Sequence, residues 1–265
     1  RLRRRGVTPG LAALQVGDDP ASRVYLNQKR KACESLGFRF VWRHLPARST
    51  ESALLGLIGR LNRDRAVHGI LVQLPLPGHL DAEGILRAVA PDKDVDGLHP
   101  VNLGRLVRLR ALDLAERQGW MLPCTPYGVI RLLRHYRVRI AGRHAVIVGR
   151  SALVGKPLAL LLLACDATVT VCHTKTRRLA EFTRRADILI AAAGRPGLIT
   201  ARHVKRGAVV VDIGTTSRGG RLRGDVAFAA VSRRAAAVSP VPGGVGPMTV
   251  AALMRNLVLT AVVRC

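Results

Sequence analysis

Aromatic and acidic residues are both scarce in this chain of 265 residues. Phenylalanine, tryptophan and tyrosine make up 3% of the sequence, and only 17 aspartates and glutamates accompany 43 lysines and arginines. The formal net charge of +26 raises nucleic acid as a possible partner. The basic residues are scattered along the chain, however, and no aromatic residues that could stack on bases accompany them. We therefore expect no specific recognition of nucleic acid.

Paired cysteines and long apolar runs are absent as well. The 5 cysteines include no C-x-x-C pair and are odd in number, which favours neither a disulfide framework nor a zinc site. No run reaches the roughly eighteen apolar residues of a membrane span, since 250–263 contains Arg255 and Asn256. The basic start Arg1–Arg5 is not followed by the apolar stretch of a signal peptide. We expect a soluble, cytoplasmic protein without a bound metal.

Glycine, leucine, valine and alanine dominate what remains. Apolar residues make up 48% of the chain, with 26 glycines and 14 prolines, a composition typical of an α/β protein. The length is sufficient for one large domain or two modest ones.

The stretch Ala145–Leu163 predicts a strand, a glycine turn and a helix in close succession. Gly149 would allow a sharp turn after the strand, and Gly155 would allow the helix to pack tightly on it. Free N–H groups at the start of such a helix favour an anion, most often a pyrophosphate. The spacing is G-R-S-x-x-x-G rather than G-x-G-x-x-G, so an ordinary β–α turn is the alternative.

A second strand, Thr168–Cys172, follows this helix and bears on the choice of cofactor. Folds that bind NAD place an acidic residue after this strand for the ribose hydroxyls, and none is present here. Donor-rich and basic residues follow instead: His173, Thr174, Lys175, Thr176 and Arg177, with Arg150 from the first turn. This set suits a 2′-phosphate and predicts NADP. The alternative is an exposed basic loop in an arginine-rich chain.

In the N-terminal part, a strand over Leu11–Val16 and a turn lead to a helix that Ser22 could cap. Within it Tyr25, Lys29 and Cys33 recur every four residues and share one face. A tyrosine against a heterocycle with a lysine one turn further on could form an acid/base site. The competing interpretation is an ordinary exposed lysine.

Further strands are expected over Phe38–Leu45 and Gly69–Leu74, and helices over Glu51–Leu61 and Ala82–Val89. Gln73 would lie at the carboxyl end of its strand, where α/β sheets bind ligands.

An acid-rich loop, Pro91–Gly97, stands out in so basic a chain. It is either a solvated turn or a place where Asp94 or Asp96 accepts a hydrogen bond from a substrate N–H. Later in the chain, Asp187–Ala192 and Ala208–Asp212 predict buried strands, and a helix is expected to start at Thr125 and Pro126.

Seven runs in fixed order carry a family resemblance: VGDDPASRVYLNQKRKAC, GILVQLPLP, PDKDVDGLHPVNLGRL, PCTPYGV, VGRSALVGKP, ADILIAAAGRPG and PVPGGVGPMT. Together they cover nearly the whole chain and resemble the bifunctional methylenetetrahydrofolate dehydrogenase/methenyltetrahydrofolate cyclohydrolase family. The resemblance implies NADP-dependent oxidation of methylenetetrahydrofolate and hydrolysis of the product, in one-carbon metabolism and purine biosynthesis. It also implies a homodimer, with polyglutamylated folates as possible substrates.

The resemblance further implies roles for individual residues. In this family the lysine of the Y-x-x-x-K helix is catalytic, the glutamine of the VQLPLP strand holds it, and the second aspartate of DVDG binds the pterin. The catalytic set would be Lys29, Gln73 and Asp96. Substrate would be bound by these residues and by Tyr25, Leu74, Pro75, Pro242, Gly243 and Gly244. NADP would be held by Gly149, Arg150, Ser151, Gly155, His173, Thr174 and Thr215. Cys124 would line the site without acting as a nucleophile.

The same comparison implies an α/β protein of two domains with a cleft between them. A folate-binding catalytic domain would comprise residues 1–123 and 248–265, and a Rossmann-like, parallel-sheet NADP domain would comprise 124–247. The helix after Pro247 would return to the first domain. Two features depart from the family. An additional strand and helix usually precede the segment with which this sequence starts, and Arg110–Gly119 replaces a short glycine-containing connection.

Two other functions stay open at this stage. One is a catalytically idle relative associated with nucleic acid, and the other is an NADP-dependent Rossmann dehydrogenase of a different small acid.

Overall fold

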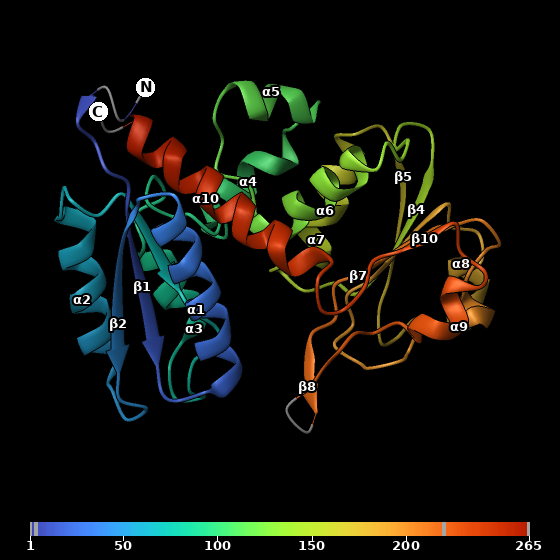
Figure 1. Ribbon diagram of the computed structural model, residues 1–265, viewed down its shortest axis with the longest axis horizontal. Coiled ribbons are helices and arrows are strands. Elements are labelled where there is room, and N and C mark those ends of the chain that lie inside the picture. Colours follow the sequence, from blue (N-terminus) through green and yellow to red (C-terminus); the bar gives the residue numbers. More distant parts are fainter. Residues whose placement is uncertain (1, 3–4, 219–220, 264–265) are drawn as a thin grey trace. The chain divides into compact units, whose positions relative to one another are not determined.

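The computed structural model describes residues 2, 5–218 and 221–263, which form two compact units (Figure 1). The first unit comprises Arg1–Gly104, Gly119–Cys124 and Val250–Cys265. The second comprises Arg105–Gln118 and Thr125–Thr249.

A three-stranded parallel sheet with the order β2-β1-β3 organises the first unit. Its elements follow one another in the chain as β1 (Gly10–Val16), α1 (Pro20–Ser35), β2 (Arg39–Leu45), α2 (Glu51–Arg63), β3 (Gly69–Val72), α3 (Ala82–Ala88) and the start of α4 (Pro100–Val107). Because β1 is the central strand, all seven of its residues are buried, which agrees with its uninterrupted apolar run.

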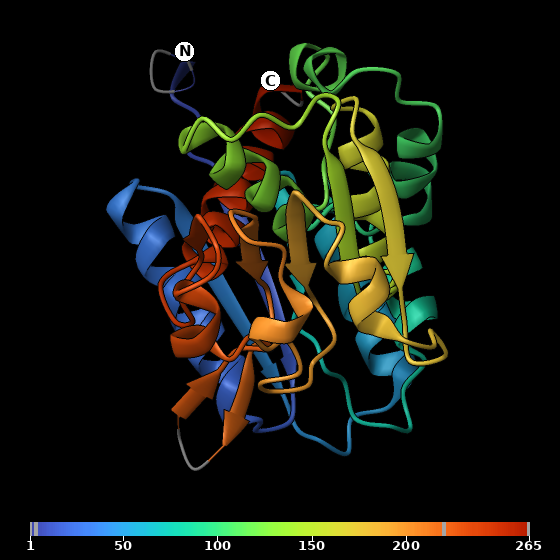
Figure 2. The ribbon, with the colours of Figure 1, turned by 90° about the vertical axis from the view of Figure 1, so that its right-hand side faces the viewer.

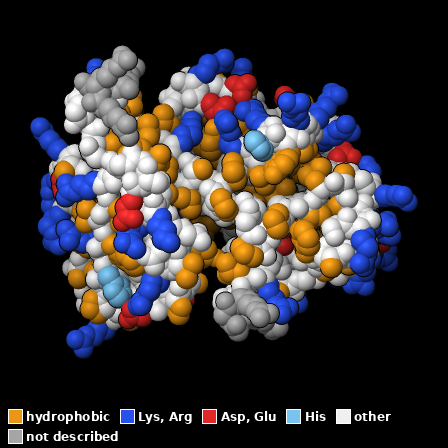
Figure 3. All heavy atoms as spheres, viewed as in Figure 1, with side chains coloured by type: hydrophobic (Ala, Val, Ile, Leu, Met, Phe, Trp, Pro, Cys, Tyr) orange, Lys and Arg blue, Asp and Glu red, His pale blue; other side chains and the backbone are white. Residues whose placement is uncertain are grey.

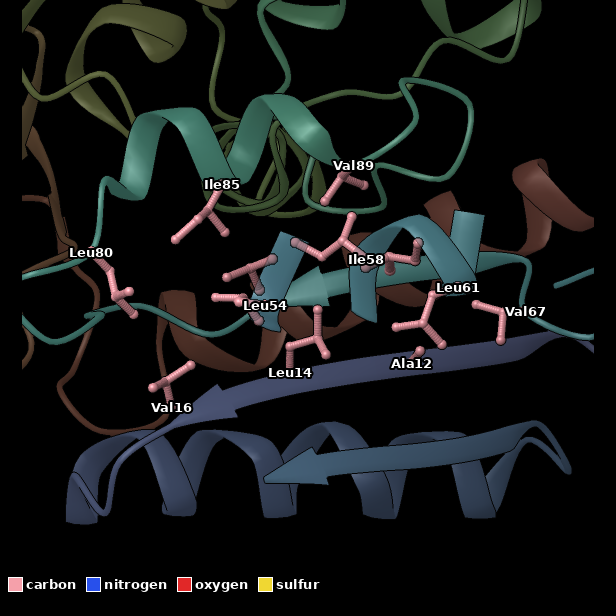
Figure 4. Packing of buried hydrophobic residues seen from close by; sticks show 12 residues of the cluster. Ala12, Leu14, Val16, Leu54, Ile58, Leu61, Val67, Leu80, Ile85 and Val89 are labelled. Atoms are coloured by element: carbon pink, nitrogen blue, oxygen red, sulfur yellow. The ribbon is translucent and has the colours of Figure 1, made fainter. Parts of the chain in front are cut away.

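The side chains of β1 alternate between the two faces of this sheet. Ala12, Leu14 and Val16 point toward the helices α2 and α3, where they meet residues such as Leu54 and Ile85 (Figure 4). All of these side chains are less than 9% exposed, so this layer is a continuous apolar core. Burial of this kind contributes roughly 1.5–3 kcal/mol per large aliphatic side chain.

The second unit is built on a five-stranded parallel sheet with the order β10-β7-β6-β4-β5, whose arrows run in one direction in Figure 2. Its strands are β4 (His144–Val148), β5 (Thr168–Cys172), β6 (Ile188–Ala191), β7 (Val209–Asp212) and β10 (Ala237–Val238). Its helices are α5 (Leu112–Arg117), α6 (Cys124–His135), α7 (Gly155–Leu163), α8 (Leu179–Thr183), α9 (Phe228–Ser232) and the short 3₁₀ turn Ala201–His203. A hairpin of β8 (Thr216–Arg218) and β9 (Arg221–Arg223) follows β7. This sheet is of the Rossmann-like type.

Helix α10 (Val245–Val263) ends the described chain. Its length and its mean hydropathy of 1.4 would suit a membrane span, and 44% of the span is buried inside the protein. Asn256 and Thr260 are among its buried residues. A largely buried core helix of a soluble protein has these same properties, so they are weak evidence for a membrane.

The segment that departs from the family pattern folds into α5 and its flanks. Asp113 and Glu116 of this helix pair with Arg134 of α6 at 2.9 and 3.2 Å, and the Tyr127 hydroxyl donates to Glu116 at 2.6 Å. Charged and polar contacts therefore attach this segment to α6.

Lysine and arginine side chains are spread over the visible surface and do not form one patch (Figure 3).

The start of α1 corrects one expectation. Asp19, rather than Ser22, caps this helix, because the Asp19 carboxylate accepts from the Ser22 backbone N–H at 2.7 Å. Ser22 is buried inside the first turn, and its hydroxyl donates to the Leu74 carbonyl at 3.4 Å.

Several other boundaries differ by small shifts, for example those of β3, α6 and α10. The strand β3 ends at Val72, so Gln73 lies just beyond it. The helix expected from Thr125 begins at Cys124, and the helix expected after Pro247 begins at Val245. Shifts of one to three residues reflect the weak definition of element ends by sequence.

Candidate active site and cofactor-binding loops

The amine of Lys29 is the centre of the candidate active site in the first unit. It lies on the buried face of α1, with a relative exposure of 9%, and its Nζ donates a hydrogen bond to Gln73 Oε1 at 2.9 Å. Sequence spacing placed Tyr25 and Cys33 on the same face, and Cys33 is fully buried. The Tyr25 hydroxyl is also buried and has no hydrogen-bond partner among the described residues.

Gln73 is held so that its carboxamide oxygen faces Lys29. Its backbone N–H donates to the Leu14 carbonyl at 2.8 Å and continues the pairing with β1 beyond the end of β3. Its side-chain Nε2 donates to the carbonyl of Leu74 at 2.7 Å. Since the amide nitrogen is engaged there, Oε1 is left to accept from the amine. The peptide bond that follows, Leu74–Pro75, is cis.

The acid-rich loop lies next to this pair because it runs alongside β3. The Ile70 N–H donates to the Lys93 carbonyl at 2.8 Å, which extends the free edge of the sheet toward Asp94. Lys93 is fully buried, and its Nζ donates to the carbonyls of Leu61 and Asp64 at 2.8 and 2.7 Å.

The two aspartates of this loop have different tasks. Asp94 accepts from the N–H groups of Gly97 and His99 at 3.1 and 2.7 Å and from the Asn102 side chain at 2.9 Å. Its oxygens are therefore used to close the turn. Asp96 accepts none of these three bonds.

Electrostatics at this centre favour a neutral lysine. Burial lowers the pKa of Lys29 from its ordinary value, while the nearby Asp96 carboxylate raises it part of the way back. Burial raises the pKa of Asp96, and Lys29 opposes that shift. Burial also raises the pKa of the Cys124 thiol well above its usual range, so this thiol stays protonated and is a poor nucleophile.

In the second unit, the turn after β4 contacts the turns after two neighbouring strands. The Gly149 N–H donates to the Cys172 carbonyl at 2.9 Å, and Gly149 has a φ of +139°. A Cβ at this position would collide with the Ala192 backbone carbonyl, so only glycine fits. The first turn and the loop that follows β5 thus lie side by side at the carboxyl edge of the sheet.

Ser151 corrects the expectation of free N–H groups at the start of α7. Its hydroxyl accepts from the N–H groups of Val154 and Gly155 at 3.1 and 3.4 Å, and its carbonyl accepts from Lys156 at 3.0 Å. Since Pro157 has no N–H, the first turn of this helix is already satisfied. A phosphate here would depend on the turn itself and on the exposed Arg150.

The loop after β5 presents donors and no acid. The His173 N–H donates to Thr176 Oγ1 at 2.9 Å, and the Lys175 N–H donates to His173 Nδ1 at 3.2 Å, which closes the loop on itself. Thr174, Lys175 and Arg177 are exposed. Thr215, after β7, is exposed at the same edge of the sheet.

Two family models match separate parts of this chain. Residues 1–96 match the catalytic domain of tetrahydrofolate dehydrogenase/cyclohydrolase, and residues 123–265 match its NAD(P)-binding domain. The chain belongs to this family.

Individual relatives agree with that assignment. The bifunctional protein FolD of Halalkalibacterium halodurans is 49% identical over 98% of this chain and 91% of its own length. FolD of Methanospirillum hungatei is 52% identical over 98% of this chain and 90% of its own length. As a member of the tetrahydrofolate dehydrogenase/cyclohydrolase family, the chain is an oxidoreductase and a hydrolase of folate one-carbon metabolism.

Solved structures show the same fold. FolD from Campylobacter jejuni has a TM-score of 0.91 at 46% identity and covers 100% of this chain and 92% of its own. FolD from Trypanosoma brucei, solved with NADP cofactor and inhibitor, has a TM-score of 0.91 at 42% identity and covers 98% and 89%. The two-domain α/β fold of the family is therefore also the fold of this chain.

The predicted site residues fall into separate groups. Lys29, Gln73 and Asp96 come together in the first unit, whereas Pro242, Gly243 and Gly244 belong to the second. In that segment the Val241–Pro242 bond is cis and Gly243 has a φ of +99°.

Two buried carboxylates in the second unit were missed as site residues. Asp225 accepts from the N–H groups of Ala193 and Gly194 at 2.6 and 2.8 Å, which holds the loop after β6. Asp212 accepts from Gly214, Asp225 and Val226 and so holds the loop after β7. In the sequence Asp212 stands out only as the last residue of a predicted strand, and the aspartate of RGDVAF gives no local signal of such a role.

Proposed function

We propose that this chain oxidises methylenetetrahydrofolate with NADP and then hydrolyses the methenyl product to formyltetrahydrofolate, and that Lys29, Gln73 and Asp96 form the catalytic centre. The observation that carries the proposal is the buried amine of Lys29, which donates to Gln73 at 2.9 Å and whose pKa is lowered by burial next to Asp96. A buried, neutral amine is suited to moving one proton at a time.

Hydrolysis of the methenyl group requires that water lose a proton as it attacks. The water oxygen forms a bond to the methenyl carbon, and its proton passes to the free electron pair of Lys29 Nζ. The carbon–nitrogen bond then breaks as the protonated amine returns this proton to the leaving nitrogen. The hydroxyl of the intermediate gives its remaining proton to the freed amine, which releases it to solvent, and the C=O of the formyl group is formed. Gln73 Oε1 accepts a hydrogen bond from an N–H of the Lys29 amine and so keeps the amine in place. This bond leaves the lone pair of the amine nitrogen available.

Asp96 would fix the substrate for both reactions. Its carboxylate would accept from an N–H of the pterin, because the oxygens of Asp94 are already occupied within the loop. Tyr25 would stack on the pterin, and Leu74 and Pro75 would border it. The buried hydroxyl of Tyr25, which has no partner among the described residues, would be available to a ligand.

The donor set of the second unit fits NADP. Gly149, Arg150 and Ser151 would hold the pyrophosphate side, Gly155 allows the close turn, and Thr215 lies further along the same edge. His173 and Thr174, with the neighbouring Lys175 and Arg177, would hold the 2′-phosphate, since no acid between Cys172 and Arg178 would repel it. When bound, NADP supplies the acceptor for the hydride of the methylene group.

The proposed division of labour follows the two units. Residues 1–123 and 248–265 would form the folate-binding domain, and 124–247 the NADP domain, with Pro242, Gly243 and Gly244 contributing to the folate site. We further propose a cytoplasmic homodimer that supplies purine biosynthesis and accepts polyglutamylated folates. The support is membership of the family, and the excess of basic residues would favour an anionic tail. Light scattering of the purified chain measures the oligomeric state.

One turnover assay tests the function. The purified chain is mixed with methylenetetrahydrofolate and either NADP or NAD, and the reduced cofactor, the methenyl product and the formyl product are followed. The proposal expects all three products, with a higher efficiency for NADP. Absence of folate turnover alongside activity on another small acid would support a different dehydrogenase. Steeply salt-dependent RNA binding without NADP binding would support an idle relative.

A further inference from the structure

Asn256 is a buried amide in the apolar helix α10, remote in sequence from every residue of the catalytic centre. Its relative exposure is 0%. Burying an amide among apolar side chains costs free energy unless its hydrogen bonds are made, so the partners of Asn256 indicate its task.

Both bonds from Asn256 to oxygen reach other segments of the chain. Its Nδ2 donates to the carbonyls of Val95 and Leu122 at 2.9 and 2.8 Å, and it lies 3.6 Å from the Cys124 sulfur. Its Oδ1 accepts from Arg255 Nη1 at 3.2 Å, which fixes the orientation of the carboxamide. A single side chain thus joins α10 to the acid-rich loop and to the segment before α6.

These two segments carry the groups that act on Lys29. Val95 directly precedes Asp96, and the Cys124 N–H donates to the Asp96 carbonyl at 3.1 Å. The Cys124 thiol donates to the Val95 carbonyl at 3.1 Å. Gly97, with a φ of +71°, packs so closely that an added Cβ would lie 2.6 Å from the Leu122 carbonyl oxygen. Hydrogen bonds from Cys124 therefore fix the backbone on both sides of the Val95–Asp96 peptide bond. Asn256 adds bonds that tie this segment to Leu122 and to α10.

We propose that Asn256 is a positioning residue for both reactions, because its amide holds the Asp96 backbone where the carboxylate can act on substrate and on Lys29. Asn256 itself donates to the Val95 and Leu122 carbonyls and accepts from Arg255, and its effect passes through Asp96. The inference rests on the proposed function, since it assigns Asp96 a role in that site.

Replacing Asn256 with leucine removes the donors and keeps the size of the side chain. The Asp96 segment would then relax, and a displacement of about 1 Å at a reacting group lowers kcat/KM by about ten- to a hundredfold. The expected pattern is a higher KM for folate and a lower kcat in both reactions, with the KM for NADP unchanged.

The pH profile gives a readout that mere loss of stability would not move. The titratable groups near Lys29 are Asp96 and Cys124. The Asp96 carboxylate raises the pKa of Lys29 against the effect of burial, whereas the protonated Cys124 thiol carries no charge. If the Asp96 segment moves away, the pKa of Lys29 falls further. The acidic limb of the hydrolysis profile should therefore shift to lower pH in Asn256→Leu.

Thr260→Val is the matched control. Thr260 lies on the same helix, is 2% exposed, and its hydroxyl donates to the Leu257 carbonyl at 2.8 Å. This variant also loses a buried hydrogen bond but does not touch the Asp96 segment. It should keep the parental pH profile and the parental KM values.

Asn256→Ser keeps one donor in a smaller side chain and should fold even if the leucine variant does not, with an intermediate shift of the profile. A folded Asn256→Leu or Asn256→Ser protein with parental KM and pH profile would overturn the inference, as would an equal shift in Thr260→Val. If the parent itself does not turn over folate, or if Lys29→Met still hydrolyses methenyltetrahydrofolate, the proposed function has failed independently of Asn256.

Discussion

Replacing Gln73 with glutamate is a sharp perturbation of the proposed centre, because it adds one charge with almost no change in shape. In the parent, the neutral Oε1 of Gln73 accepts from Lys29 Nζ at 2.9 Å. A carboxylate at this distance favours the charged form of the amine. The pKa of Lys29, which burial lowers in the parent, should therefore rise in Gln73→Glu.

The size of the effect follows from the distance. An opposite charge within 4–6 Å typically moves a pKa by about 1–3 units, and each unit reduces the neutral fraction of the amine about tenfold below that pKa. At pH values below the parental pKa of Lys29, hydrolysis of methenyltetrahydrofolate should therefore fall by about ten- to a thousandfold. It should recover by about tenfold for each unit of increasing pH until the new pKa is reached.

The assay is the disappearance of methenyl absorbance between about pH 6 and about pH 9, with the uncatalysed rate subtracted at each pH. Gln28→Glu is the control, because Gln28 is an exposed residue of α1, the helix that carries Lys29. The control adds the same charge at the position next to Lys29 in the sequence. The control should keep the parental profile. An acidic limb that does not move in Gln73→Glu, or that moves equally in Gln28→Glu, would refute the idea that a neutral Lys29 drives hydrolysis.

Two further predictions concern the second unit. Arg150→Ala should raise the KM for NADP by about ten- to a hundredfold, since a lost charge-assisted phosphate contact costs roughly 1.5–3 kcal/mol. Steady-state kinetics with NADP and NAD measure this effect, and an unchanged KM would show that Arg150 does not bind the cofactor. Asp225→Ala should lower the free energy of unfolding by about 1–3 kcal/mol for each of the two N–H groups, Ala193 and Gly194, that lose their acceptor. Urea unfolding measures it, and an unchanged midpoint would mean that other acceptors replace the carboxylate.

The strands that are buried on both faces of a sheet could be predicted from the sequence. The apolar runs of β1, β3 and β4 correctly predicted a parallel α/β protein, because such strands have no polar face to confuse the pattern. Strand order and the short elements α5, α8 and β10 were not predictable, since they depend on tertiary contacts and not on local periodicity.

Within the candidate site, the spacing of Tyr25 and Lys29 and the polar Gln73 at a strand end gave usable local signals. The sequence could not distinguish Asp94 from Asp96, because only the folded loop shows which carboxylate closes the turn. Asn256 did interrupt an apolar run, but its partners lie 134 and 161 residues away in sequence. No local pattern can encode contacts at that separation.

The central claim is that Lys29 handles the protons of hydrolysis, and Lys29→Met tests it most directly, since methionine has a similar length but no amine. Methenyl hydrolysis and NADP affinity are measured for Lys29→Met and for Lys31→Met, which removes an exposed lysine from the same helix. The account predicts that Lys29→Met abolishes hydrolysis with parental NADP affinity, and that Lys31→Met changes neither. Hydrolysis by Lys29→Met at the parental rate would contradict it.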